Sequence, residues 1–340
     1  MKTLKSLKKI FVIAFIALAA YSCSDDDNNE VQESIYEIAA NDPNGNYNTF
    51  VSFLDRAELA ELKGMLDGTA SGSVKYTVFL PSESAFADFL VQHGYNPGNL
   101  QSVPTNFIGP ILRNHIIEGE VLSSTTLLGN GLGYHSTMAQ EQTSGDSHNI
   151  SLFYYNNNGA LEINGASSVV TADYKASNGI AHVVDAVLDI PTMLTFLQAD
   201  PTFDRFQEAI GLIDAANGDN SYSTGYAQFG GPAPFTILAP NSAAFDAVLA
   251  ELGAVNLSDI TPSDLEIMLN VHVVADNNYL SSDLMDGMVI GTQAGNITIN
   301  VAGSAITATD QNNRTANVIQ TNIQSGNGVI HILDMVLLPL

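Results

Sequence analysis

The sequence is short of several residue types, and each shortage argues against a class of protein. Cys23 is the only cysteine among 340 residues, so no intramolecular disulfide can form and the fold must depend on its cores. Tryptophan is absent, which removes the strongest stacking side chain from any sugar-binding surface. Lysine and arginine number 11 against 36 acidic residues, for a formal net charge of −25. Such a surface repels phosphate backbones, which argues against nucleic acid as a partner.

Motifs that carry catalysis or hold metals are also missing. The chain has no Gly-x-Ser-x-Gly elbow, no phosphate loop and no His-Glu-x-x-His pair. The oxygen-rich loop around Asp214, Asn217, Asp219 and Asn220 lacks the order of an EF-hand. We therefore expect a protein that is not an enzyme and that has no cofactor or metal.

The amino terminus has the order of an export signal. Four lysines precede the apolar run 10–20, which is shorter than the ~20 residues of a membrane-spanning helix. Ala20-Tyr21-Ser22-Cys23 resembles a bacterial lipobox, and the acidic stretch 24–27 that follows resembles the export tag of Bacteroidota surface lipoproteins. These resemblances imply a signal peptide over 1–22, lipidation of Cys23, an acidic tether over 23–33, and lipid anchoring in the outer membrane, exposed at the cell surface.

Cleavage would make the chain still more acidic. Removing residues 1–22 takes away four lysines and no acidic residue, which changes the formal net charge from −25 to −29. The seven remaining basic residues are scattered along the sequence without a basic patch. We therefore expect contact with the membrane through the lipid anchor only.

The rest of the chain contains one long pattern twice. Thr77–Phe86 returns as Thr236–Phe245, and Ser177–Asp185 returns as Gly326–Asp334. Each copy spans about 150 residues, which is enough for a domain with its own core and too long for a solenoid unit. The sequence therefore predicts two tandem domains, over residues 34–190 and 191–340.

Each copy changes its hydrophobic period partway along. A helical stripe such as Phe50, Phe53 and Leu54 opens the first copy, and a short apolar strand with a Pro-Ser or Pro-Asn helix start follows. A third helix is predicted around 111–117 and 265–274. The second half of each copy alternates apolar and polar residues, as strands do, and an Asn-Gly turn precedes the last strand. Helices followed by strands indicate an α+β fold.

The paired blocks resemble the fasciclin domain family. They are Thr77–Phe86 with Thr236–Phe245, Leu112–Ser124 with Leu269–Ser282, and two closing Asn-Gly-x-x-His-x-x-Asp motifs. The resemblance implies two fasciclin-like domains, each a β-wedge of about seven strands packed with several short helices. It also implies a non-catalytic role in adhesion. The family's Tyr-His pair is replaced here by Asn114-His115 and Val271-His272.

Four histidines recur at family positions: His115, His272, His182 and His331. On a strand, His182 and Asp185 face opposite sides of the sheet, which is a poor arrangement for shared acid–base chemistry. His115 and His272 lie in apolar helical contexts. We expect all four to be packed, hydrogen-bonded side chains, with no catalytic or metal role.

The remaining candidate site is an aromatic surface. Tyr154 and Tyr155 stand beside three asparagines, and Tyr222, Tyr226 and Phe229 lie in a long loop of the second copy. Aromatic faces mixed with amides suit protein edges or sugars. We expect a surface lipoprotein that mediates adhesion by binding a protein or the extracellular matrix. The alternatives are a glycan-binding accessory lipoprotein of a polysaccharide-uptake system and a hydrolase whose site is not visible in sequence.

Overall fold

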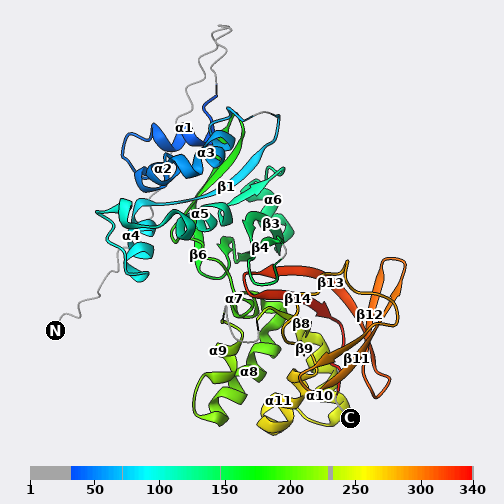
Figure 1. Ribbon diagram of the computed structural model, residues 1–340. Helices are drawn as coiled ribbons and strands as arrows, with labels where there is room; N and C mark the ends of the chain where they lie inside the picture. Colours follow the sequence, from blue (N-terminus) through cyan, green and yellow to red (C-terminus); the bar gives the residue numbers. More distant parts are fainter. Residues whose placement is uncertain (1–31, 71, 146, 229–232, 339–340) are drawn as a thin grey trace, which may run out of the picture. The chain divides into compact units, whose positions relative to one another are not determined.

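The computed structural model describes residues 32–70, 72–145, 147–228 and 233–338. The signal peptide, Cys23, most of the tether and Phe229 lie outside these residues. The described part forms one compact unit in which two halves share the same order of strands (Figure 1).

The first domain begins with helices and ends with strands, as the change of period predicts. Its helices are α1 (Ile35–Ala40), α2 (Asn48–Leu54), α3 (Ala60–Leu66), α4 (Glu83–Gln92), α5 (Thr105–Asn114) and α6 (Ser124–Asn130), with 3₁₀ turns η1 (Ala57–Leu59) and η2 (Leu100–Ser102). Its strands are β1 (Tyr76–Pro81), β2 (Ile116–Glu118), β3 (Leu132–Gln140), β4 (Asn149–Asn157), β5 (Ala160–Ile163), β6 (Ser167–Ala176) and β7 (Gly179–Val184).

The second domain has the same succession of helices and then strands, without a counterpart of α6 in the described residues between β9 and β10. Its helices are α7 (Met193–Ala199), α8 (Asp204–Asn217), α9 (Ser221–Gly225), α10 (Ser242–Leu252) and α11 (Pro262–Asn270), with 3₁₀ turns η3 (Pro201–Phe203) and η4 (Leu257–Asp259). Its strands are β8 (Phe235–Pro240), β9 (Val273–Val274), β10 (Val289–Thr292), β11 (Gly295–Ala302), β12 (Ala305–Thr309), β13 (Thr315–Ser325) and β14 (Gly328–Leu333).

Each domain contains a seven-stranded sheet. The strand orders are β2-β1-β7-β6-β5-β4-β3 and β10-β11-β12-β13-β14-β8-β9. The two repeated sequence blocks form the parallel pairs β1–β7 and β8–β14, while the other pairings are antiparallel. The predicted α+β class with two domains of about seven strands is confirmed.

Strand β1 is buried throughout because it lies between two cores. Val78 and Leu80 face the helices and pack with Phe50 and Phe86, whereas Phe79 points to the other face and packs with residues of β4 and β5. Alternate side chains of a strand point to opposite faces, so a strand buried on both sides reads as a continuous hydrophobic run.

The helix after each Pro-Ser or Pro-Asn step begins as the sequence predicts. Ser82 accepts the N–H of Ala85 at 3.2 Å through its hydroxyl, and Asn241 accepts that of Ala244 at 2.8 Å through its side-chain oxygen. Both residues are therefore N-caps, of α4 and α10 respectively.

The third predicted helix is correct only in its first part. Helix α5 ends at Asn114 and α11 at Asn270, and the segments that follow, Ile116–Glu118 and Val273–Val274, are strands. Helical periodicity continued through these apolar residues in the sequence, but they pair with β1 and β8 instead. Tertiary pairing therefore overrides a short apolar pattern that suits helix and strand equally.

In each Asn-Gly step, the glycine supplies the positive φ of the turn and the asparagine supplies side-chain hydrogen bonds. Gly179 and Gly328 take positive φ values of 153° and 157°, whereas neither asparagine does. Asn178 instead accepts the N–H of Ile35 at 2.9 Å and donates to the carbonyl of Leu66 at 2.8 Å. The asparagine therefore ties the last strand of the domain to its first helices.

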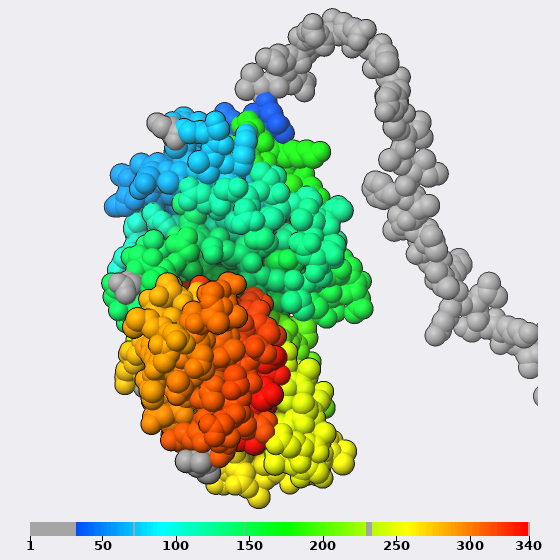
Figure 2. Space-filling model, turned by 90° about the vertical axis from the view of Figure 1, so that its right-hand side faces the viewer, coloured from blue at the N-terminus to red at the C-terminus, as the bar shows by residue number. Residues whose placement is uncertain are grey.

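The two domains share part of a core. Phe153 of β4 belongs to the hydrophobic cluster of the second domain, and Tyr134 of β3 and Tyr155 of β4 pack against that cluster. The hydroxyl of Tyr134 donates to Asp200 at 2.8 Å, and its ring meets Phe196 edge-on at 5.4 Å. In the space-filling view, orange residues of the second domain directly adjoin green residues of the first (Figure 2).

Candidate functional site

The histidines that follow α5 and α11, His115 and His272, connect separate main-chain segments by hydrogen bonds. The Nε2 atom of His115 accepts the N–H of Leu188 at 2.8 Å, so its Nδ1 carries the proton and donates to the carbonyl of Ile111 at 2.7 Å. His272 repeats this arrangement with Leu337 and Met268, both at 2.9 Å. Burial lowers the pKa of each ring to about 4. Both rings are therefore neutral, and both nitrogens of each ring are hydrogen bonded to main-chain atoms.

The histidines of the last strands form a second matched pair. His182 lies between the N–H of Asp173 at 3.2 Å, accepted by Nδ1, and the carbonyl of Leu122 at 2.8 Å. His331 makes the same contacts with Asn322 and Tyr279. Burial lowers the pKa of both rings. All four family histidines thus join main-chain segments.

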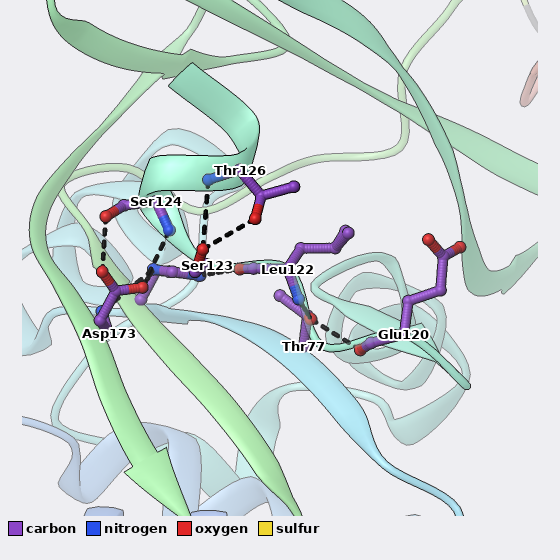
Figure 3. Close-up of polar contacts among 8 residues, drawn as sticks. Thr77, Glu120, Leu122, Ser123, Ser124, Thr126 and Asp173 are labelled. Atoms are coloured by element: carbon purple, nitrogen blue, oxygen red, sulfur yellow. Dashed lines mark hydrogen bonds and ion pairs between the residues drawn. The ribbon is translucent and has the colours of Figure 1, made fainter. Parts of the chain in front are cut away.

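Beside His182, a serine and an aspartate complete a set of residue types that is familiar from hydrolases. Figure 3 shows Ser124 turned toward Asp173, whose carboxylate accepts the serine N–H at 2.9 Å and its hydroxyl at 2.5 Å. The serine thus donates to the carboxylate, and both nitrogens of His182 are occupied by main-chain atoms. A nucleophilic serine needs a basic nitrogen within reach of its own hydroxyl, so this geometry holds the loop rather than activating the serine.

The aspartates of the closing motifs also hold turns. Asp185 accepts the N–H of Ser168 at 2.7 Å, and Asp334 accepts the N–H of Asn317 at 2.7 Å. Asp214, from the oxygen-rich loop, accepts the N–H of Tyr222 at 2.9 Å. Within the described ranges, no group of three or more His, Cys, Asp or Glu side chains is placed to hold a metal ion.

The structure does not gather the candidate tyrosines on one surface. Tyr154 is buried and stacks on His135 at 5.4 Å, and Tyr155 packs against the hydrophobic cluster that Phe153 shares with the second domain. Tyr226 is buried in the second core, where Tyr222 meets it edge-on at 5.6 Å and donates to Asn270 at 2.9 Å. Burial raises the pKa of both Tyr222 and Tyr226. The described members of the predicted surface therefore serve packing, and Phe229 lies outside the described residues.

A hollow of about 520 Å³ lies over α5 in the first domain. Its apolar lining includes Phe107, Pro110 and Ile111 of α5 with Ile150 of β4 and Ile190 of the segment that joins the domains. Pockets of this volume with an apolar lining and a few polar groups are the usual form of a binding site.

A second hollow, of about 440 Å³, shares lining residues Pro110, Gln140 and Gln142 with the first. Its far side is lined by Glu61, Arg113 and Glu118, among others. We refer to the two hollows together as the α5 groove.

Polar groups in the α5 groove favour a ligand that donates hydrogen bonds. Pro110 has no N–H, so the helical hydrogen bond to the carbonyl of Asn106, another lining residue, is missing. Asp189 lies 3.2 Å from His93, and the two amide side chains Gln140 and Gln142 stand between the hollows. Carboxylates outnumber guanidinium and ammonium groups along the groove.

Sequence reasoning missed this groove. Its residues come from three separate stretches, around 61–65, 93–118 and 138–150, with Asp189 and Gly326 at its rim. The one usable signal was Pro110, a helix breaker inside an apolar helical pattern.

Comparison with known proteins agrees with this fold. Transforming growth factor-beta-induced protein ig-h3 of Sus scrofa is 27% identical over 293 residues, which cover 84% of this chain and 37% of that protein. Periostin of Homo sapiens is 26% identical over 287 residues, covering 83% of this chain and 30% of its own. The fasciclin-like arabinogalactan protein of Arthroderma benhamiae is 23% identical over 310 residues, which cover 83% of this chain and 64% of that protein. The chain thus spans well under half the length of the first two relatives.

A solved FAS1 domain pair from the insect cell adhesion molecule Fasciclin I superimposes with a TM-score of 0.52 at 18% identity, covering 87% of this chain and 98% of that one. The fasciclin domain profile matches residues 45–191 and 204–339. These segments make up most of the chain and both halves of the duplicated fold, so this protein belongs to the fasciclin domain family and contains two tandem fasciclin domains.

Proposed function

We propose that this protein is a lipid-anchored adhesion protein of the bacterial outer surface that binds a protein or matrix partner through the α5 groove. Its export signal, Cys23 and acidic tether support the anchor. Membership of a family that includes a solved pair from a cell adhesion molecule supports the adhesive role. None of the described helices has the length and apolar character needed to cross a membrane.

The observation that carries the proposal is the apolar, open lining of the first hollow. Phe107 packs with Phe89 at 5.9 Å and Tyr95 at 5.2 Å, so its ring is held in place at the groove. Rigid aromatic side chains next to aliphatic ones are the usual anchors of protein interfaces. The nearby carboxylates suit a partner segment that carries lysine or arginine.

The test is a binding screen of residues 24–340 against matrix proteins and a glycan array, followed by Gln142→Arg. This exposed residue lines both hollows, so a long cationic side chain would obstruct the groove and repel a basic partner. We expect at least a tenfold loss of affinity for the protein found in the screen. Gln311→Arg, at an exposed turn of the second domain, is the matched control and should bind like the wild type.

Two results would contradict the proposal. Equal binding by the Gln142→Arg and Gln311→Arg proteins would place the contact elsewhere. Hits confined to the glycan array and displaced by free sugar would instead support a glycan-binding accessory lipoprotein.

A further inference from the structure

Two lysines that are 100 residues apart in the sequence line one shallow pocket of the first domain. The pocket measures about 360 Å³ and is mostly apolar, with Val121, Ala176 and Ile180 beside Lys75 and Lys175. Gln32, the first described residue, also lines it. We call this surface the lysine pocket.

These lysines differ from most other basic side chains of the described ranges. Lys63, Arg205 and Arg314 each lie within 2.8 Å of a carboxylate. The ammonium of Lys75 donates to the carbonyl of Ser177 at 2.5 Å, and within the described ranges no carboxylate lies within 4.0 Å of either pocket lysine. The charge of Lys175 does help to lower the pKa of the nearby Asp173 carboxyl. In so acidic a chain, two lysines on one apolar surface without a close ion pair favour an anionic ligand.

The loop that carries Val121 is held on both sides by hydrogen bonds, which Figure 3 shows. Thr77 donates to the carbonyl of Glu120 at 2.8 Å and accepts the N–H of Leu122 at 2.9 Å. Asp173 holds the next turn through Ser124. Val121 stands between these fixed points with 52% of its surface exposed. An exposed aliphatic side chain on a fixed loop is preorganised for contact.

In the second domain, the surface equivalent to the lysine pocket is covered by the first domain. Its loop is built alike, because Thr236 donates to Asn277 and accepts from Tyr279. The counterparts of Val121 and Lys175 are Asn278 and Gln324, which hydrogen bond to each other. Gln324 is buried, and its N–H donates to Ser151 of the first domain at 3.0 Å. This end of the second domain is therefore an interface, while its counterpart in the first domain is open.

We propose that the lysine pocket seats the first domain on anionic lipid headgroups of the membrane that holds Cys23. The inference rests on the proposed lipid anchor. Eight residues lie between Cys23 and Gln32, so the anchor can be at most about 30 Å of extended chain away from Gln32, which itself lines the pocket. Lysine beside aliphatic side chains matches a surface of phosphate groups over hydrocarbon.

The negative net charge, from which membrane contact through the lipid anchor only is expected, opposes this contact mainly through carboxylates near the pocket. Charges farther from the membrane than a Debye length of about 8 Å are largely screened at physiological ionic strength. Tethering also replaces a bimolecular encounter by an intramolecular one, so weak headgroup contacts suffice.

The test couples residues 23–340 through the single cysteine to maleimide lipid in vesicles, and measures amine acylation of each lysine by mass spectrometry. Lys63, Lys75 and Lys175 are the only lysines after Cys23, and Lys63 pairs with Asp55 away from the pocket. We expect Lys75 and Lys175 to react at least threefold more slowly on vesicles with 30% phosphatidylglycerol than on pure phosphatidylcholine, with Lys63 unchanged. Lys175→Gln should relieve the protection of Lys75, and the control Lys63→Gln should not.

Equal rates on neutral and anionic vesicles would overturn the proposal. Slower acylation of Lys75 and Lys175 in uncoupled protein as its concentration rises, without vesicles, would assign the pocket to contact between copies and overturn it too. Chemical coupling replaces cellular acylation in this experiment. A failure here is therefore distinct from a failure of the anchor, which palmitate labelling of the wild type against Cys23→Ser would show.

Discussion

His115 and His272 show how a polar residue is kept inside an apolar core. Each ring is fully buried, yet both of its nitrogens bond to main-chain atoms, so no polar atom of the ring is left without a partner. The arrangement requires the neutral ring, because a protonated Nε2 would no longer accept an N–H. Stability should therefore depend on pH.

The free energy of unfolding should fall as the pH is lowered from about 6.5 to about 4. The unfolded histidines take up protons near pH 6.5, whereas the folded rings of His115 and His272 resist protonation down to about 4. The unfolded state therefore binds more protons in this window, and each ring contributes a slope of up to about 1.4 kcal/mol per pH unit. His182 and His331, whose pKa values are also lowered, act in the same direction.

Urea denaturation at several pH values between 4 and 7.5 measures this slope. His272→Gln should reduce the pH dependence of the unfolding free energy by the contribution of one histidine ring. His115→Gln should reduce it by a similar amount in the first domain. An unchanged slope in both variants would show that other groups govern the acid sensitivity.

At the scale of elements, the parallel pairs β1–β7 and β8–β14 determine where glycine is required. A Cβ on Gly179 would lie 2.0 Å from the carbonyl oxygen of Tyr76, and one on Gly328 would lie 2.3 Å from that of Phe235. The obstacles are main-chain atoms of the neighbouring strand, which cannot move without breaking the pairing.

Gly179→Ala should destabilise the protein by about 3 kcal/mol or more, because the backbone clash adds to the cost of a positive φ. Gly129→Ala is the matched control, since it lies in α6 with no atom within 4 Å of its added Cβ. It should be neutral or stabilising by a few tenths of a kcal/mol. Thermal unfolding of the two variants compares them, and equal losses would mean that the strand approach tolerates a side chain.

Sequence patterns identified most elements but failed where a segment suits two structures. The N-caps Ser82 and Asn241 were readable because capping is local. The apolar segments after α5 and α11 were not, because their strand conformation depends on partners about 40 residues earlier in the chain. Likewise, aromatic residues beside asparagines suggested a surface, but Tyr154 and Tyr226 are packed inside.

In the whole molecule, the contact between the domains contains a buried hydrogen bond surrounded by apolar side chains. Asp200 is buried and accepts the hydroxyl of Tyr134 at 2.8 Å and the N–H of Thr202 at 2.8 Å. Burial, followed by the charge of Asp200, raises the pKa of Tyr134, which keeps the hydroxyl protonated as a donor. Gly165 also approaches Ala199 so closely that a Cβ there would lie 2.8 Å from the alanine Cβ.

Tyr134→Phe should therefore cost about 1–3 kcal/mol and weaken the coupling of the two domains, because it leaves a buried carboxylate oxygen without its donor. Tyr36→Phe removes an equally short bond, 2.8 Å to Asp55, at an exposed site and should cost less than about 1 kcal/mol. Chemical denaturation followed by domain-specific probes compares them. Equal losses of unfolding free energy in the two variants would refute the coupling. So would a single unfolding transition that is unchanged in both variants.

The duplication, the α+β class and the family can all be inferred from sequence alone, because repeated motifs, caps and hydrophobic periods are local patterns. The folded chain is needed to see which aromatic residues are buried, that α5 borders a groove, and that Lys75 and Lys175 share a pocket. Those features arise from contacts between segments far apart in the chain, and no local pattern specifies which distant segment a side chain will meet.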